Sequence, residues 1–236
     1  MSARGLKIGI CGGTFDPFHR GHLEPVLAVR ESMQWDRVIY IPAWRQPFKL
    51  ERQTASAYHR FAMAVLATQS HDGVFVSPME LERGATSYSV ETLEVLHREY
   101  RGATFDWIIG DDNVPDLGKW KDVDRIFELA NFVVLSRNAA APQPSDDVDD
   151  DDDDDADVDI TIDADADAAA GLATCAMPSA RAAHGCIVYA PNETVPVSST
   201  EIRRRLADGE PIDDLVDPLV SRYIHHNRLY TTGVHS

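Results

Sequence analysis

Short runs of apolar residues alternate along this chain with longer stretches in which apolar residues recur every three or four positions. The short runs predict buried strands at 6–11, 38–41, 74–76, 105–109, 132–135 and 186–189. The longer stretches predict amphipathic helices at 21–33, 55–69, 89–100, 121–129, 199–208 and 213–227. Apolar strands that alternate with such helices are typical of a parallel sheet covered on both faces. The pattern therefore predicts an α/β fold with a Rossmann-like, doubly wound parallel sheet, in which ligands bind beyond the carboxyl ends of the strands.

This alternation is interrupted between residues 139 and 183. Fourteen aspartates and no lysine or arginine fall within 146–167, and they account for most of the net charge of −17. Such a segment cannot bury a core, and its like charges repel, so we expect it to be disordered. The sequence thus predicts one domain, formed by 1–138 and 184–236, with an acidic low-complexity insertion at 139–183. Seven consecutive aspartates at 149–155 could instead bind divalent cations or a basic partner, but a solvated acidic segment is the commoner case.

The rest of the composition narrows the function classes. Outside the acidic segment the charges nearly balance and no basic stripe occurs, which argues against a nucleic-acid partner. No apolar run is long enough to cross a membrane, and no signal-peptide core precedes the first strand. Three cysteines without metal-type spacing fit a reducing compartment. We therefore expect a cytoplasmic protein without a membrane partner and without a metal site built from its own side chains; a homo-oligomer is compatible with the sequence.

The first predicted strand runs directly into a glycine turn and a helix start, in residues 7–22 (KIGICGGTFDPFHRGH). Gly12 and Gly13 allow the backbone to approach a ligand closely. His19 and His22 are three residues apart, so at a helix start they share one face, where backbone N–H groups favour anions. Two imidazoles beside such N–H groups suit a polyphosphate. An ordinary glycine turn with a surface histidine is the simpler alternative.

A second motif favours the polyphosphate interpretation. Residues 10–22 resemble the GTFDPxHxGH signature of the nucleotidyltransferase superfamily, and residues 197–203 (VSSTEIR) resemble its (I/V)SSTxIR motif. The resemblance implies adenylyl or cytidylyl transfer, in which an acceptor phosphate attacks the α-phosphorus of a nucleotide and pyrophosphate leaves, with Mg²⁺ as the cofactor. His19 and His22 would be the catalytic donors to the phosphates. The ATP-binding set implied by the resemblance is Gly12, Gly13, Thr14, Phe15, His19, His22, Gly110, Asp111, Ser199, Thr200 and Arg203.

Three of these residues have structural alternatives or additional roles. Ser199 and Thr200 are expected to cap the helix at 199–208, which in this superfamily is also a phosphate site. Arg203 lies four residues after Ser199 on the same helix face. Asp111 would accept a hydrogen bond from a ribose hydroxyl. Asp16, within the first motif, is interpreted equally well as a helix cap.

Further segments resemble one branch of the superfamily, the bacterial nicotinate-nucleotide adenylyltransferases. These segments are 87–93 (SYSVETL), 107–112 (WIIGDD), 119–121 (KWK), 132–137 (FVVLSR) and 223–230 (YIHHNRLY). The resemblance covers nearly the whole chain except 139–183. It implies adenylyl transfer from ATP to nicotinate mononucleotide, which gives deamido-NAD and pyrophosphate in NAD biosynthesis.

The resemblance also implies an acceptor site, made of Lys49, Ser89, Trp120, Lys121 and Arg137. Ser89 and Lys121 would offer backbone N–H groups to the nicotinate carboxylate, and Trp120 would stack on the pyridine ring. A carboxylate prefers N–H donors, whereas a carboxamide also needs an acceptor. Trp120 could alternatively be an aromatic at the edge of the core.

The acceptor side departs from the family pattern at one point. The usual PPHK-like stretch reads Gln46-Pro47-Phe48-Lys49 here, so Phe48 replaces a hydrogen-bonding histidine. Nicotinamide mononucleotide or phosphopantetheine therefore stay open as acceptors, although His19 and the Trp120 segment argue against phosphopantetheine. A nucleotide-binding module whose catalysis has decayed is the non-enzyme alternative, and the intact motif residues argue against it.

Overall fold

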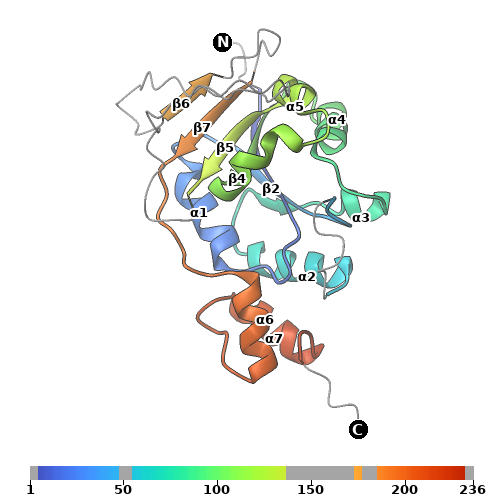
Figure 1. Ribbon diagram of the computed structural model, residues 1–236, viewed down its shortest axis with the longest axis vertical. Coiled ribbons are helices and arrows are strands. Elements are labelled where there is room, and N and C mark those ends of the chain that lie inside the picture. The colour runs from blue at the N-terminus through green and yellow to red at the C-terminus, as the bar shows by residue number, and fades with distance from the viewer. Residues whose placement is uncertain (1–4, 48–54, 137–172, 177–184, 232–236) are drawn as a thin grey trace, which may run out of the picture.

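The computed structural model describes residues 5–47, 55–136, 173–176 and 185–231 (Figure 1). Its centre is one seven-stranded sheet in the order β3-β2-β1-β4-β5-β7-β6. The strands are β1 (Lys7–Gly13), β2 (Arg37–Pro42), β3 (Val74–Val76), β4 (Thr104–Gly110), β5 (Asn131–Leu135), β6 (Ala173–Ala176) and β7 (Cys186–Ala190). All neighbours pair in parallel except β6, which is antiparallel to β7. The predicted doubly wound α/β fold is confirmed, and its strand order reverses between β1 and β4.

Helices cover the two faces of this sheet and bury two separate cores. They are α1 (Arg20–Arg30), α2 (Ala57–Thr68), α3 (Met79–Arg83), α4 (Ser89–Glu99), the 3₁₀ helix η1 (Asp111–Lys119), α5 (Val123–Leu129), α6 (Ser199–Asp208) and α7 (Pro218–His226). One core contains the apolar faces of α1, α2, α6 and α7, and the other contains those of α4 and α5. Successive residues of a strand enter opposite cores: Val38 and Tyr40 enter the first, and Ile39 and Ile41 the second.

Several elements differ from the sequence prediction. The helix expected at 213–227 begins only at Pro218, because Asp217 caps it by accepting a hydrogen bond from the Leu219 N–H (2.7 Å), and proline suits the first helical position. The short α3 and the proline-containing η1 were not predicted. Within 139–183, where disorder was expected, residues 173–176 form β6 along the edge of β7. Backbone pairing that covers a sheet edge needs no apolar pattern, so no pattern of residues predicts this strand.

No helix in the described part of the chain combines the length and the apolarity that a membrane crossing needs. In Figure 1, α6 and α7 lie together at one end of the molecule, near the C-terminus. Helix α7 packs against α2, where His59 Nδ1 and the Tyr223 hydroxyl are 2.9 Å apart. Helix α7 is thereby held against α2.

A buried carboxylate ties the strands together at their amino ends. Asp106, in β4, is 1% exposed and accepts hydrogen bonds from Trp35 Nε1 (2.7 Å) and Asn131 Nδ2 (3.0 Å). Lys7 Nζ forms an ion pair with it at 3.1 Å. These four residues, called the Asp106 cluster below, connect β1, β4, β5 and the approach to β2 at the end of the sheet opposite the glycine turn.

Candidate active site

A cavity of about 780 Å³ opens at the carboxyl ends of the strands. The ends of β1 and β4, where the strand order reverses, both line it, which is where a doubly wound sheet binds ligands. The cavity brings together members of both predicted sets. From the nucleotide set Gly12, Gly13, Phe15, His22 and Gly110 line it, and from the acceptor set Ser89, Trp120 and Lys121.

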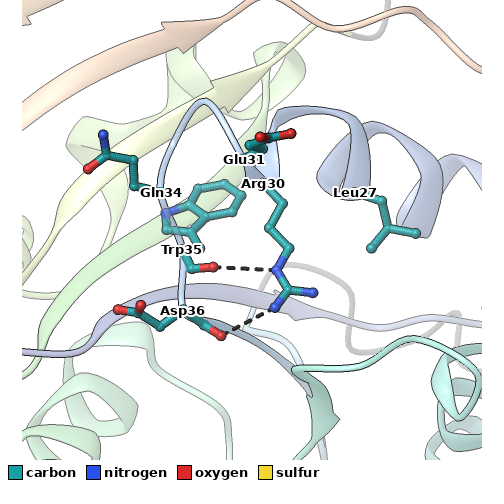
Figure 2. A pocket seen from close by; sticks show the side chains of 6 residues that line it. All are labelled: Leu27, Arg30, Glu31, Gln34, Trp35 and Asp36. Atoms are coloured by element: carbon teal, nitrogen blue, oxygen red, sulfur yellow. Dashed lines mark hydrogen bonds between the residues drawn. The ribbon is translucent and has the colours of Figure 1, made fainter.

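A second depression, of about 530 Å³, lies at the opposite end of the sheet. It is lined by residues at the end of α1 and in the turn to β2, namely Leu27, Arg30, Glu31, Gln34, Trp35 and Asp36 (Figure 2). The Arg30 guanidinium donates to the carbonyl oxygens of Trp35 (3.4 Å) and Asp36 (3.2 Å). Its donors are thus used to hold this turn, and no predicted site residue lies here.

The two histidines of the first motif form one stacked unit. His19 is the N-cap of α1, and its ring stacks on that of His22 with centroids 3.6 Å apart. The His19 backbone N–H donates to His22 Nδ1 (3.2 Å), so a neutral His22 carries its proton on Nε2 and can donate from there. The Tyr40 hydroxyl donates to the His22 carbonyl (2.9 Å), which fixes the start of the helix. His22 lines the cavity, while His19 is 6% exposed and is not among the residues that line it.

The turn between β1 and α1 is held in an unusual backbone conformation. Phe15 has φ of +54°, a region that residues other than glycine rarely adopt. Its ring is buried and packs against Phe18 (centroids 5.2 Å apart), His22 (5.0 Å) and Tyr40 (5.9 Å). The Thr14 hydroxyl donates to Gln46 Oε1 (2.6 Å), a residue that lines the cavity. Packing and hydrogen bonds together maintain this turn.

Asp16 is a connector within this turn. The side chain is 3% exposed, and Oδ1 accepts hydrogen bonds from the Ala55 N–H (3.2 Å) and the Tyr230 hydroxyl (2.7 Å). The alternative that Asp16 caps a helix is not what the structure shows, because His19 is the N-cap of α1. Burial and, next, the Asp16 charge raise the pKa of Tyr230, so its hydroxyl remains a donor.

The second motif converges on the same turn from the far end of the chain. The N-cap of α6 is Ser198, whose hydroxyl accepts from the Glu201 N–H (3.2 Å), so the expectation that Ser199 and Thr200 cap this helix is wrong. Ser199 instead donates to the Pro17 carbonyl (3.0 Å). Arg203 donates to the Asp16 carbonyl and to Thr200 Oγ1 (3.2 Å). Residues more than 180 positions apart are therefore in direct contact.

Several members of the nucleotide set do not line the cavity, although some of them contact residues that do. Asp111 accepts from the Ser136 hydroxyl (3.2 Å), and Ser136 lines the cavity. The Ser136 N–H donates to Asn192 Oδ1 (2.9 Å), which anchors this edge to the segment before α6. The residues outside the lining are Thr14, His19, Asp111, Ser199, Thr200 and Arg203.

Three members of the acceptor set, Ser89, Trp120 and Lys121, also line the cavity. Trp120 lines it while its ring contacts Phe132 edge to face (centroids 5.8 Å apart), so it is both a cavity aromatic and a core-edge aromatic. Lys121 Nζ is paired with Glu91 (2.8 Å), which raises the pKa of Lys121, and lies over the Tyr88 ring at 4.5 Å. The backbone of Lys121, rather than its ammonium, is therefore the group left for a ligand. Lys49, Phe48 and Arg137 lie outside the described residues.

Two buried charged residues near the cavity were missed by the sequence analysis. Glu80 lines the cavity and accepts from the Thr92 hydroxyl (2.6 Å); burial raises its pKa, and hydrogen bonds from Ser87 and Thr92 oppose that shift. It lies in α3, whose five residues are too few to show a periodic pattern. Arg60 is fully buried in α2. The sequence could have indicated this burial, because Arg60 is a single arginine on the apolar face of an alanine-rich helix.

No group of three or more histidine, cysteine, aspartate or glutamate side chains is close enough to hold a metal ion within the residues that the structure describes. Magnesium in nucleotide sites is bound by one or two carboxylates together with phosphate oxygens and water. The residues here fit a cation that is bound mainly by the triphosphate.

Comparison with known proteins places this site in a family context. The cytidylyltransferase-like family model matches residues 10–205. A protein of Geotalea daltonii named "Probable nicotinate-nucleotide adenylyltransferase" is 35% identical over 228 residues, covering 97% of this chain and all of the relative. One of the same name from Gemmatimonas aurantiaca is 36% identical, covering 95% of this chain and 92% of the relative. Among solved structures, a Plasmodium falciparum nicotinic acid mononucleotide adenylyltransferase complexed with NaAD has a TM-score of 0.66 at 16% identity, covering 95% of this chain and 97% of that chain, and supports the fold.

Proposed function

The chain belongs to the cytidylyltransferase-like family and, within it, to the nicotinate-nucleotide adenylyltransferases, and from this premise we propose that it transfers the adenylyl group of ATP to nicotinate mononucleotide. The products are deamido-NAD and pyrophosphate. One observation carries the proposal: a single cavity is lined both by the glycine turn with His22 and by Ser89, Trp120 and Lys121. Its volume of about 780 Å³ is in the range of small-molecule sites.

On the nucleotide side, the chemistry is positioning and charge stabilisation. A phosphate oxygen of the acceptor attacks the α-phosphorus, and the bond from that phosphorus to the pyrophosphate oxygen breaks, without a covalent enzyme intermediate. His22 Nε2–H and the His19 imidazole donate to the phosphates as negative charge moves to the leaving group. The backbone N–H groups of Thr14 and Phe15 contribute further donors. Ser199, Thr200 and Arg203 bind phosphates at the start of α6.

The glycine turn and the end of β4 supply the remaining contacts to the nucleotide, and the triphosphate binds the metal. Gly12 and Gly13 line the cavity, and a Cβ at Gly12 would meet the Trp107 ring and one at Gly13 the Phe15 ring, each at 2.8 Å, so glycine lets these rings pack against the turn. Gly110 and Asp111 meet the ribose at the end of β4. We assign Mg²⁺ to the triphosphate oxygens, where it neutralises phosphate charge when bound. ATP and nicotinate mononucleotide are the partners that this site requires.

On the acceptor side, two backbone N–H groups and one aromatic ring select the substrate. Ser89 begins α4, so its N–H is not used within the helix and suits a carboxylate. The backbone N–H of Lys121 supplies the second donor, and Trp120 stacks on the pyridine ring. Lys49 and Arg137 are assigned to the phosphate of the mononucleotide on the sequence alone.

The experiment that tests this proposal measures pyrophosphate release with ATP and Mg²⁺ and three acceptors in parallel. These are nicotinate mononucleotide, nicotinamide mononucleotide and phosphopantetheine. We expect kcat/KM for nicotinate mononucleotide to exceed the other two by at least about tenfold, because a carboxamide cannot satisfy two N–H donors as well. Activity with another acceptor alone would discard the acceptor assignment and keep the nucleotide chemistry. Absence of release with all three would favour a nucleotide-binding module without catalysis.

Replacing Trp120 with alanine tests the stacking assignment. We expect KM for nicotinate mononucleotide to rise about tenfold or more, since aromatic stacking contributes roughly 1–3 kcal/mol, and KM for ATP to change much less. Steady-state kinetics with each substrate varied in turn would measure the two values. Trp120→Phe keeps a ring and is the matched control, expected to recover most of the loss. A larger effect on the ATP value would overturn the assignment of Trp120 to the acceptor.

Removal of the acidic segment tests the proposed domain organisation. We propose that residues 142–170 are not needed for adenylyl transfer, because their composition provides no core to lose. A deletion of 142–170 that leaves 173–176 in place is expected to keep kcat within about twofold and the melting temperature within a few degrees. Thermal unfolding and pyrophosphate release would measure both. Loss of folding in this variant would show that the segment is structural.

A further inference from the structure

The buried Arg60 lies directly behind the glycine turn. It is 0% exposed, and its guanidinium donates to four backbone carbonyl oxygens, those of Thr14, Ala43 (2.7 Å), Trp44 (3.3 Å) and Ala55 (3.3 Å). Thr14 follows β1, and Ala43 and Trp44 follow β2. One side chain from α2 thus joins the two chain segments that leave adjacent strands at the edge of the cavity.

Burial of this cation is costly, and the structure shows what offsets the cost. Burial lowers the pKa of Arg60, and the nearby Asp16 charge opposes that shift. The carbonyl oxygens that accept from the guanidinium are neutral, so Arg60 keeps its positive charge beneath the turn, with the Asp16 carboxylate nearby. An apolar side chain could fill the same space without this desolvation cost. The charge and its hydrogen bonds therefore need an explanation beyond packing.

The geometry of the peptide bond supplies that explanation. The Thr14 carbonyl and the Phe15 N–H belong to one planar trans peptide, so they point in opposite directions. Because Arg60 binds the carbonyl, the Phe15 N–H is directed away from Arg60. Phe15 itself lines the cavity, and its φ of +54° shows that the surroundings maintain this turn against its local preference.

We propose that Arg60 is a positioning residue for the triphosphate: it holds the Phe15 N–H toward the phosphates of ATP and places a permanent positive charge behind them. The inference rests on the proposed function, because it requires ATP in this part of the cavity. It does not depend on which acceptor is used. Arg60 touches no substrate in this proposal and acts only through the turn.

The test compares Arg60→Met and Arg60→Lys with the wild type by isothermal titration calorimetry, using ATP and, separately, adenosine. We expect Arg60→Met to raise the Kd for ATP about tenfold and to leave that for adenosine within about twofold, since the lost interaction concerns phosphates only. Arg60→Lys keeps the positive charge but lacks the planar set of N–H donors of the guanidinium, so it should recover part of the ATP affinity. A merely structural role would not change the ratio of the two affinities.

Arg30 offers a matched control at the other end of the sheet. Its guanidinium also donates to backbone carbonyl oxygens, in this case the three of Trp35, Asp36 and Asp72, beside the depression of Figure 2. Arg30→Met should lower the melting temperature and leave the ratio of ATP to adenosine affinity unchanged. A change in that ratio equal to the one in Arg60→Met would overturn the proposal.

The remaining outcomes are also decisive. An ATP affinity within twofold of wild type in folded Arg60→Met, or an equal loss for adenosine, would overturn the proposal. If circular dichroism shows that Arg60→Met is unfolded, Arg60→Lys provides the test. We expect it to raise the Kd for ATP, but not that for adenosine, about threefold. A wild type that binds no ATP overturns it as well. A wild type that binds ATP but releases no pyrophosphate with any acceptor disproves the catalytic function and leaves this inference standing on the affinities.

Discussion

His22→Ala is expected to lower kcat by about 10²–10⁴-fold with both substrates saturating, the loss that follows removal of a donor to the transition state. The reason lies in the proton position. His22 Nδ1 accepts from the His19 N–H, so Nε2 carries the proton, and the ring lines the cavity. Alanine removes this donor and adds no group in its place. The fold should survive, because the His22 ring is only partly buried and lines the cavity.

Pyrophosphate release under saturating ATP and acceptor would measure this loss, and circular dichroism would confirm folding. His22→Gln tests the donor itself, since an amide N–H can replace Nε2–H in part, and we expect it to retain more activity than alanine. His97→Ala is the matched control: His97 hydrogen-bonds the Leu129 carbonyl (2.8 Å), outside the cavity lining. A near-normal kcat in His22→Ala would remove His22 from the mechanism.

Elements with a strong local signal could be predicted from the sequence. The strands from β1 to β5, and β7, follow from apolar runs bounded by turns, and each structural range begins or ends within two residues of its prediction. The α6 start was placed correctly, but the capping residue was not, because Ser198, Ser199 and Thr200 all have suitable hydroxyls. Only the structure shows that Ser198 accepts from Glu201 while Ser199 reaches the other motif.

Residues that connect distant segments could not be predicted in the same way. The motifs identify Gly12, His22 and Arg203 because these stand in contiguous patterns. Tyr230 binds Asp16 across more than 200 positions, and no local pattern encodes such a contact. These contacts depend on how the packed helices α2, α6 and α7 meet the turn. The sequence therefore predicts which groups can do the chemistry, and the packing decides which groups hold them in place.

The two ends of the sheet have different roles: one carries the groups proposed for the chemistry, and the other carries a cluster that stabilises the fold. The carboxyl ends carry the cavity, the stacked histidines and the turn with positive φ, at the end of the sheet where a doubly wound fold binds its ligands. The amino ends carry the Asp106 cluster, where a buried carboxylate accepts from Trp35 and Asn131 and pairs with Lys7. Substitutions at the two ends should consequently separate activity from stability.

Asp106→Ala is expected to lower the free energy of unfolding by about 3–5 kcal/mol, the range for breaking a buried charged network from one side. Alanine leaves the buried Trp35 Nε1–H and the Asn131 amide without their acceptor and removes the partner of Lys7. Urea unfolding would measure the loss. The kcat of the protein that remains folded should stay within about twofold, because the cluster is at the far end of the sheet from the cavity.

The control for this prediction is an exposed ion pair. Glu128→Ala breaks the contact of Glu128 with Arg125 on α5, where both side chains are nearly half exposed, and should cost less than about 1 kcal/mol. A loss in Asp106→Ala as small as in this control would show that water satisfies the Asp106 partners. A fall in kcat at unchanged stability would contradict the division between the two ends. The expected pattern, a large loss of stability with activity retained, is the reverse of that expected for His22→Ala.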